Sequence, residues 1–155
     1  MKKIILVLFI LVAANSMKGQ TFDKGTSVIH LGLGVGGNFG TPLGIGYEKG
    51  ISDKIGIGGF AGYSSKSFAG FKVTNILLAV KGNYHFYQTD KLDTYAGAML
   101  GYAIANVASG GTFADDGVNF GGQIGARYYF TDSIGAFAEL GYGIANLNVG
   151  VAFKL

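Results

Sequence analysis

The chain has 155 residues, enough for one domain but not for two separate hydrophobic cores. Only 14% of the residues are charged, roughly half the usual share, and there are 28 glycines and one proline. So few charges exclude an ordinary water-facing exterior and indicate a surface that faces lipid.

The first nineteen residues have the pattern of a secretory signal peptide. A basic start, MKK, precedes an unbroken apolar run from Ile4 to Ala14. This run is well short of the roughly 20 apolar residues that a transmembrane helix needs, so an uncleaved anchor is the weaker alternative. We therefore expect residues 1–19 to be removed and residues 20–155 to form the mature domain.

The mature chain is balanced in charge. The formal net charge of +3 comes from three lysines before Gln20, and nine basic and nine acidic residues remain after it. Because no basic stripe is interleaved with aromatic residues, nucleic-acid binding is not expected. Cysteine is absent, which excludes a lipoprotein anchor and a disulfide framework.

Alternation of apolar and polar residues with a period of two runs through almost all of the mature chain. Most alternating segments are close to the roughly 9–11 residues that a tilted strand needs to cross a bilayer. Eight strands are predicted, at residues 27–36, 43–51, 55–64, 74–86, 94–105, 118–130, 134–142 and 147–155.

The links between these strands are of two kinds. Every second link is a short turn with an aspartate, at Asp53, Asp90 and Asp132. The intervening links, which are richer in Gly, Ser and Asn, are residues 37–42, 65–73, 106–117 and 143–146. We expect the first kind to be periplasmic turns and the second kind extracellular loops, with both termini in the periplasm.

The two faces of the predicted strands differ in content. One face, which includes Leu31 and Leu78, carries no charged residue in any of the eight strands. The other face is rich in glycine and holds a few isolated polar residues, as the narrow lumen of a small barrel requires. The sequence therefore predicts an eight-stranded antiparallel up-and-down transmembrane β-barrel; a secreted soluble β-protein is the alternative.

Five charged residues share the predicted lumen face. Unpaired charge in a narrow, poorly hydrated lumen is costly, so we expect these side chains to form a connected ion-pair network that plugs the barrel. They are Glu48, Lys81, Arg127, Glu139 and Lys154.

Aromatic residues on the outward face fall into two belts, as expected at the two lipid–water interfaces. The belt near the aspartate turns contains Tyr47, Tyr84, Phe86, Tyr128, Phe130 and Phe153. The belt near the loops contains Tyr63, Tyr102, Phe120 and Tyr142. By the same phase, four other aromatic residues face the lumen: Phe60, Tyr95, Tyr129 and Phe137.

Several short motifs have simpler interpretations than a functional site. Residues 32–37 match G-x-G-x-x-G, but another strand follows instead of the helix that a dinucleotide site needs.

His30 and His85 could join Glu48 at a metal, although hydrogen bonding inside the barrel is the expected role. No serine is predicted beside either histidine, which disfavours a hydrolase. The aspartates at 115–116 could bind a cation but are expected to be solvated.

The eight strands, turns such as those at 87–90 and 129–132, and the closing segment 147–155 resemble the small outer-membrane β-barrel proteins. Those are proteins like the transmembrane domain of OmpA or like OmpX. The resemblance implies a bacterial outer-membrane location, contact with lipid and lipopolysaccharide, and assembly by the barrel-insertion machinery. Such proteins usually end on an aromatic residue, whereas here the aromatic is Phe153 and Leu155 is last.

We expect a structural or membrane-integrity role for a monomeric barrel with a polar, plugged lumen. No catalytic, cofactor-binding or metal-binding residue is predicted. A narrow porin-like channel for ions or small solutes is the main alternative. A surface-binding protein is disfavoured by the short loops, and a lipid-modifying enzyme is disfavoured by the placement of the histidines.

Overall fold

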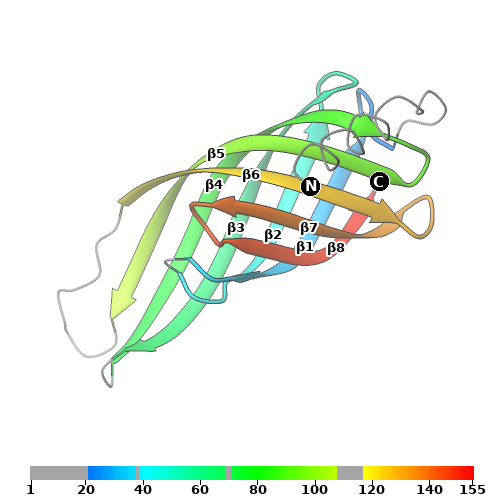
Figure 1. The fold of residues 1–155 in the computed structure, drawn as a ribbon. Helices are drawn as coiled ribbons and strands as arrows, with labels where there is room; N and C mark the ends of the chain where they lie inside the picture. The colour runs from blue at the N-terminus through cyan, green and yellow to red at the C-terminus, as the bar shows by residue number, and fades with distance from the viewer. Residues whose placement is uncertain (1–20, 38, 69–70, 108–116) are drawn as a thin grey trace, which may run out of the picture.

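A computed structural model describes residues 21–37, 39–68, 71–107 and 117–155. The described chain forms one closed barrel in which each strand pairs antiparallel with its neighbours in sequence and the last strand pairs with the first (Figure 1). The strands are β1 (Ser27–Val35), β2 (Leu43–Gly50), β3 (Ile55–Phe68), β4 (Phe71–Gln88), β5 (Leu92–Val107), β6 (Gly117–Tyr129), β7 (Ile134–Tyr142) and β8 (Leu147–Lys154). The predicted eight-stranded up-and-down barrel is confirmed.

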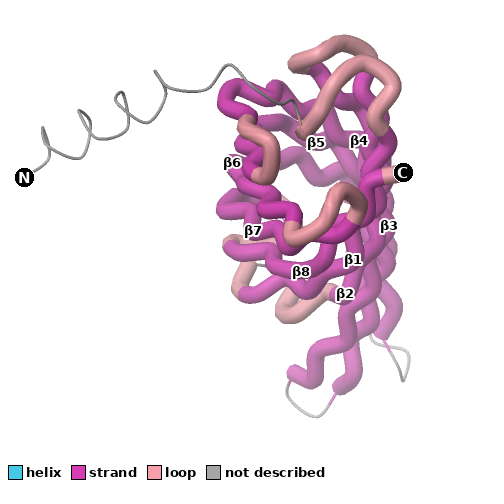
Figure 2. Tube along the Cα trace, turned by 90° about the vertical axis from the view of Figure 1, so that its right-hand side faces the viewer, coloured by secondary structure: helices cyan, strands magenta, loops and turns pink. Residues whose placement is uncertain are grey.

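Strands account for most of the described chain (Figure 2). Among the described residues no helix is long and apolar enough to cross a membrane. The predicted signal peptide, residues 1–19, lies outside the described residues.

The prediction of a loop at residues 65–73 is wrong. The β3–β4 ladder continues from Ser65 paired with Thr74 to Phe68 paired with Phe71. Figure 1 shows this hairpin reaching well beyond the link between β7 and β8. Serine and glycine in this segment indicate a loop by composition, but they do not end a strand whose cross-strand ladder continues.

Alternation sets which side chains face outward and which face the lumen. Leu77 is 3% exposed, whereas Leu78, the next residue, is 52% exposed. The predicted girdle residues follow this phase: nine of them are between 42% and 68% exposed, and Phe153 is half-buried. The exterior of the barrel is therefore apolar, as lipid contact requires. The position of both belts at lipid–water interfaces stays a prediction.

Three turns at one end of the barrel, here called the turn end, are built in the same way. The hydroxyls of Ser52, Thr89 and Thr131 each accept hydrogen bonds from the backbone N–H groups two and three residues further on, at 2.9–3.4 Å. The opposite end of the barrel, which carries the long β3–β4 hairpin, is called the loop end below.

A register shift between His85 and Tyr87 marks a β-bulge near the turn end of β4. Beyond the bulge Gln88 pairs with Asp93, and Asp93 is fully buried in the lumen. Because directly paired residues share a face of a sheet, the bulge turns both His85 and Gln88 toward the interior.

Candidate functional site

The lumen at the turn end contains a closed ring of four ionisable side chains, here called the arginine cluster: Glu48, His85, Asp93 and Arg127. Arg127 donates to Glu48 Oε2 through one terminal nitrogen and to Asp93 Oδ2 at 3.1 Å through the other. His85 lies 2.7 Å from Asp93 Oδ1 through Nδ1 and 3.1 Å from Glu48 Oε1 through Nε2. All four residues are at most 3% exposed.

The arginine cluster crosses the whole lumen. Glu48 lies on β2 and Arg127 on β6, which are four strands apart in a ring of eight and therefore on opposite walls. Buried charges are stable only when they are paired and hydrogen-bonded, and a small barrel has no room for them to be solvated separately. The cluster thus acts as a crossbar of side chains between two walls of the barrel.

Both ring nitrogens of His85 face carboxylate oxygens. A neutral imidazole carries a single N–H, so only the doubly protonated ring donates to both carboxylates. In that form the cluster contains two positive and two negative groups. Its charge is then balanced within the barrel.

A second group, here called the lysine pair, lies further along the lumen. Lys81 Nζ is 3.0 and 3.2 Å from the two carboxylate oxygens of Glu139. The hydroxyl of Tyr95 donates to Glu139 Oε1 at 2.9 Å, and the Arg127 guanidinium lies 4.3 Å from the centre of the Tyr95 ring. Tyr95 therefore links the lysine pair to the arginine cluster.

Amide side chains extend the connection. Asn83 donates to Glu48 Oε1 at 2.8 Å, and Gln123 donates to Asn83 Oδ1 at 2.8 Å. Glycines on the wall leave the space for these groups, since a Cβ at Gly56 would lie 2.1 Å from Glu48 Oε1 and one at Gly97 would lie 2.1 Å from Asn83 Oδ1.

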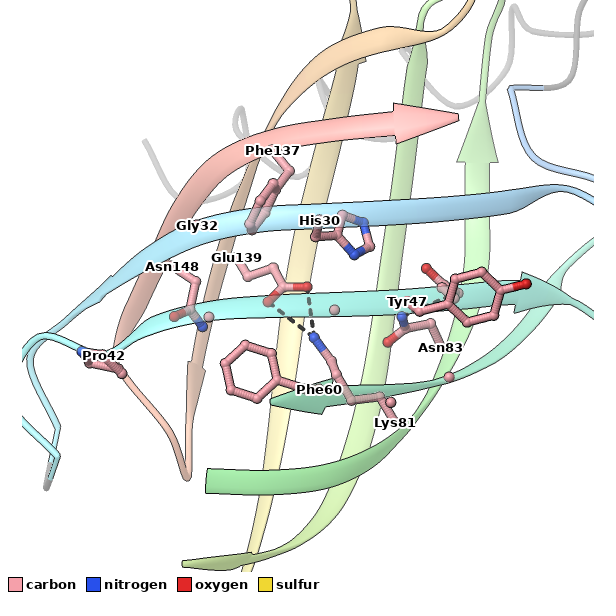
Figure 3. Close-up of a pocket in the computed structure, with 15 residues that line it drawn as sticks. His30, Gly32, Pro42, Tyr47, Phe60, Lys81, Asn83, Phe137, Glu139 and Asn148 are labelled. Carbon is pink, nitrogen blue, oxygen red and sulfur yellow. Dashed lines mark hydrogen bonds and ion pairs between the residues drawn. The ribbon is translucent and has the colours of Figure 1, made fainter. Parts of the chain in front are cut away.

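Little empty space remains around the lysine pair. Cavities of ≈ 30 Å³ and ≈ 20 Å³ adjoin it, and both are lined by Phe60, Lys81, Glu139 and Asn148. Each holds only about one or two water molecules. Figure 3 shows the larger of the two. His30 lines the larger cavity, and its buried Nε2 atom has no hydrogen-bond partner among the residues that the structure describes.

Apolar side chains close the loop end. Leu77, Met99 and Ala103 from the walls pack against Ile144 and Ala145. The last two belong to the link between β7 and β8, so this link folds inward instead of standing away from the barrel. The lumen is therefore occupied by polar groups toward the turn end and by an apolar cluster toward the loop end.

The structure brings four of the five predicted lumen charges into two ion-paired groups. Glu48 and Arg127 belong to the arginine cluster, and Lys81 and Glu139 form the lysine pair. Lys154 has a different contact from the one predicted, because its Nζ lies 5.2 Å from the centre of the Tyr129 ring.

Asp93 is a member of the cluster that the sequence prediction missed. The predicted fifth strand began at residue 94, whereas β5 begins at Leu92. The short turn before it, capped by Thr89, was the available signal. Extending the alternation back by two residues would have placed Asp93 on the lumen face with Tyr95.

The other motifs find no support as sites. No group of three or more His, Cys, Asp or Glu side chains suited to a metal ion occurs in the described part of the chain. Residues 32–37 comprise the end of β1 and the start of a link that leads to β2, so the helix of a dinucleotide site is missing there. The aspartates at 115–116 lie outside the described residues.

No protein-family model and no curated protein matches the chain. Solved structures do. The N-terminal β-barrel domain of Pseudomonas aeruginosa OprF matches with a TM-score of 0.64 and 21% identity over 86% of this chain and 98% of its own. The P. aeruginosa outer membrane protein OprG matches with a TM-score of 0.64 and 14% identity, over 89% and 99%.

A de novo designed transmembrane β-barrel is also similar, with a TM-score of 0.62 and 17% identity over 86% of this chain and 98% of the designed one. At these identities the likeness concerns the fold. A designed barrel shares this fold, so the fold alone does not indicate a function. The function of this chain depends on the residues of its lumen and its surface.

Proposed function

Because the chain has the fold of the small eight-stranded outer-membrane β-barrels, we propose that it is an outer-membrane protein with a structural, membrane-integrity role. It is a monomer with both termini in the periplasm. Its partners are outer-membrane lipid, lipopolysaccharide and, during assembly, the barrel-insertion machinery. It carries out no catalysis.

The observation that carries this proposal is the filled lumen. The arginine cluster spans two opposite walls, the lysine pair lies beyond it, and apolar residues close the loop end. A protein specialised for transport needs a continuous water path, which this arrangement opposes. A filled, cross-braced barrel with an apolar exterior is suited to persisting in a bilayer.

A narrow channel is the second candidate, and one observation favours it. The cavities of ≈ 30 Å³ and ≈ 20 Å³ adjoin Lys81 and Glu139, so a rearrangement of this ion pair would join them. On this view the lysine pair is the narrowest part of a path for ions or very small solutes.

A deletion strain of the source bacterium tests the structural role. We expect the strain to take up a hydrophobic fluorescent dye faster than its parent and to be more sensitive to detergent, because a membrane-integrity protein supports the outer-membrane barrier. The wild-type gene should restore both properties. As a matched control, a gene carrying Lys91→Met, a change at an exposed residue of a turn, should restore them equally. Dye uptake and detergent sensitivity identical to those of the parent would contradict the structural role.

A further inference from the structure

A short segment crosses the turn end of the barrel without belonging to the sheet. It comprises residues Thr21–Gly25 and is called the strap here. Thr21 is 2% exposed and Phe22 is fully buried, whereas the remaining three residues are exposed. The strap therefore inserts its first side chains into the mouth of the barrel and leaves the rest in solvent.

Phe22 rests directly on the arginine cluster. Its ring stacks on the ring of His85, with the centroids 3.6 Å apart and an interplanar angle of 9°. It also belongs to a buried apolar group with Val28, Phe137 and Ala152. The ring thus separates the buried charges of the cluster from the turn-end mouth.

The strap is attached by a few hydrogen bonds to several parts of the rim. The Thr21 hydroxyl donates to the carbonyl of Leu92 at 3.2 Å, and the Phe22 N–H donates to Gln88 Oε1 at 3.1 Å. Further along the strap, the Lys24 N–H donates to Asp53 Oδ1 at 3.3 Å. These bonds connect the strap to the rim near β5, near β4 and at the turn between β2 and β3.

The far end of the strap is a tight turn that contains a glycine. Gly25 has φ = 99°, a left-handed conformation that favours glycine, and its N–H donates to the carbonyl of Gly50 at 2.9 Å. The Thr26 N–H donates to the carbonyl of Asp23 at 3.2 Å, which closes a tight turn just before β1.

The strap can leave without opening the barrel. Pairing of β1 begins at Ser27 with β2 and at Val28 with β8, so both β1 ladders lie beyond the strap. The bond from Gly25 to Gly50 at the end of β2 can stay in place when the rest of the strap leaves. Segments held by few, partly solvent-exposed hydrogen bonds open at lower free energy than the sheet to which they are attached.

We propose that the strap is a hinged lid over the arginine cluster. It swings away from the turn end while the barrel stays folded, and this motion admits water to the seat of Phe22 and to the buried charges beneath it. The proposal does not depend on the structural role of the protein, because a lid over one mouth is compatible with a plugged lumen or with a narrow channel.

Cysteine accessibility tests the lid, because the chain has no cysteine of its own. Ala152→Cys is a small change at a fully buried residue of the Phe22 seat, and it provides a single reporter thiol. The refolded protein is treated with a charged methanethiosulfonate that does not cross the bilayer, and the rate of modification is measured. Unheated gel migration reports the folded fraction in each sample.

Two strap variants are compared in the reporter background. Phe22→Ala removes the side chain that covers the seat. Gly50→Ala leaves the strap sequence intact but places a Cβ 2.1 Å from the carbonyl oxygen of Asp23, which displaces the strap. Gly82→Ala is the matched control, because a Cβ there meets no atom within 4 Å and the residue is exposed on the outer face.

We expect the thiol at residue 152 to be modified at least about tenfold faster in both strap variants than in the parent reporter, because labelling of a buried group follows the population of the open state. In the Gly82→Ala control the thiol should be modified at the parent rate. Parent-like rates in both strap variants, with the barrel migrating as the folded species, would overturn the proposal. Faster modification confined to the unfolded fraction would overturn it as well. Conductance measurements address the state of the lumen separately, so failure of the lid and failure of the structural role are distinguishable.

Discussion

Replacement of Arg127 by methionine is expected to lower the free energy of unfolding by about 3–5 kcal/mol, because it leaves Glu48 and Asp93 buried without their shared guanidinium. Methionine keeps much of the volume of the side chain, so loss of charge pairing dominates the effect. Unfolding by urea in lipid vesicles, followed by the folded and unfolded gel bands, gives the midpoint and the free energy.

Two further variants show whether the cause is the orphaned charge. Lys91→Met removes an exposed charge in a turn and should leave the midpoint unchanged. Combining Arg127→Met with Glu48→Gln and Asp93→Asn removes the orphaned carboxylates and should recover part of the loss. An Arg127→Met protein as stable as the wild type would contradict the crossbar interpretation of the arginine cluster.

Replacement of Gly150 by valine is expected to destabilise the barrel by about 3 kcal/mol or more and to reduce the yield of folded protein sharply. Gly150 on β8 pairs with Gly32 on β1, at the seam where the barrel closes. A Cβ at residue 150 would lie 2.0 Å from the carbonyl oxygen of Leu31 and 2.8 Å from Cε1 of Phe137. The backbone oxygen belongs to the neighbouring strand, so relief of this contact disturbs the β1–β8 ladder itself.

Heat-modifiable migration on SDS gels measures the folded yield after refolding into detergent micelles. The matched control is Gly82→Val, at an outward position where a Cβ meets nothing within 4 Å and where valine suits a strand. We expect Gly82→Val to fold in wild-type yield. If Gly150→Val does so too, the argument that a close strand approach at the seam requires glycine is wrong.

The fold was predictable because alternation and the chemistry of the exterior are local properties of the sequence. Adjacent residues such as Leu77 and Leu78 take opposite faces, and a charge-free face identifies the lipid side without any knowledge of the tertiary structure. The outer ends of β3 and β4 were not predictable in the same way. Beyond the apolar band a strand and a loop have the same polarity, and only cross-strand pairing distinguishes them.

The candidate site was predictable only as a set of residues on one face. Strand phase placed Glu48, Lys81, Arg127 and Glu139 in the lumen, but partner choice depends on relative height across a tilted, staggered barrel. That stagger pairs Lys81 with Glu139 and leaves Lys154 over an aromatic ring.

The strap was missed for a different reason. The residues before β1 show no alternation, and a buried phenylalanine outside any strand has no local signature in the sequence. Its place is fixed by the cavity that the folded barrel offers, with His85 and Ala152 as its neighbours.

The most direct test of a lumen filled by side chains is the conductance of the purified wild-type protein in a planar bilayer. The arginine cluster, the lysine pair and the apolar cluster at the loop end should together prevent stable conductance steps. A membrane that remains electrically silent, while the same preparation shows heat-modifiable migration, is the predicted result. Large, stable conductance steps from the folded protein would contradict the account.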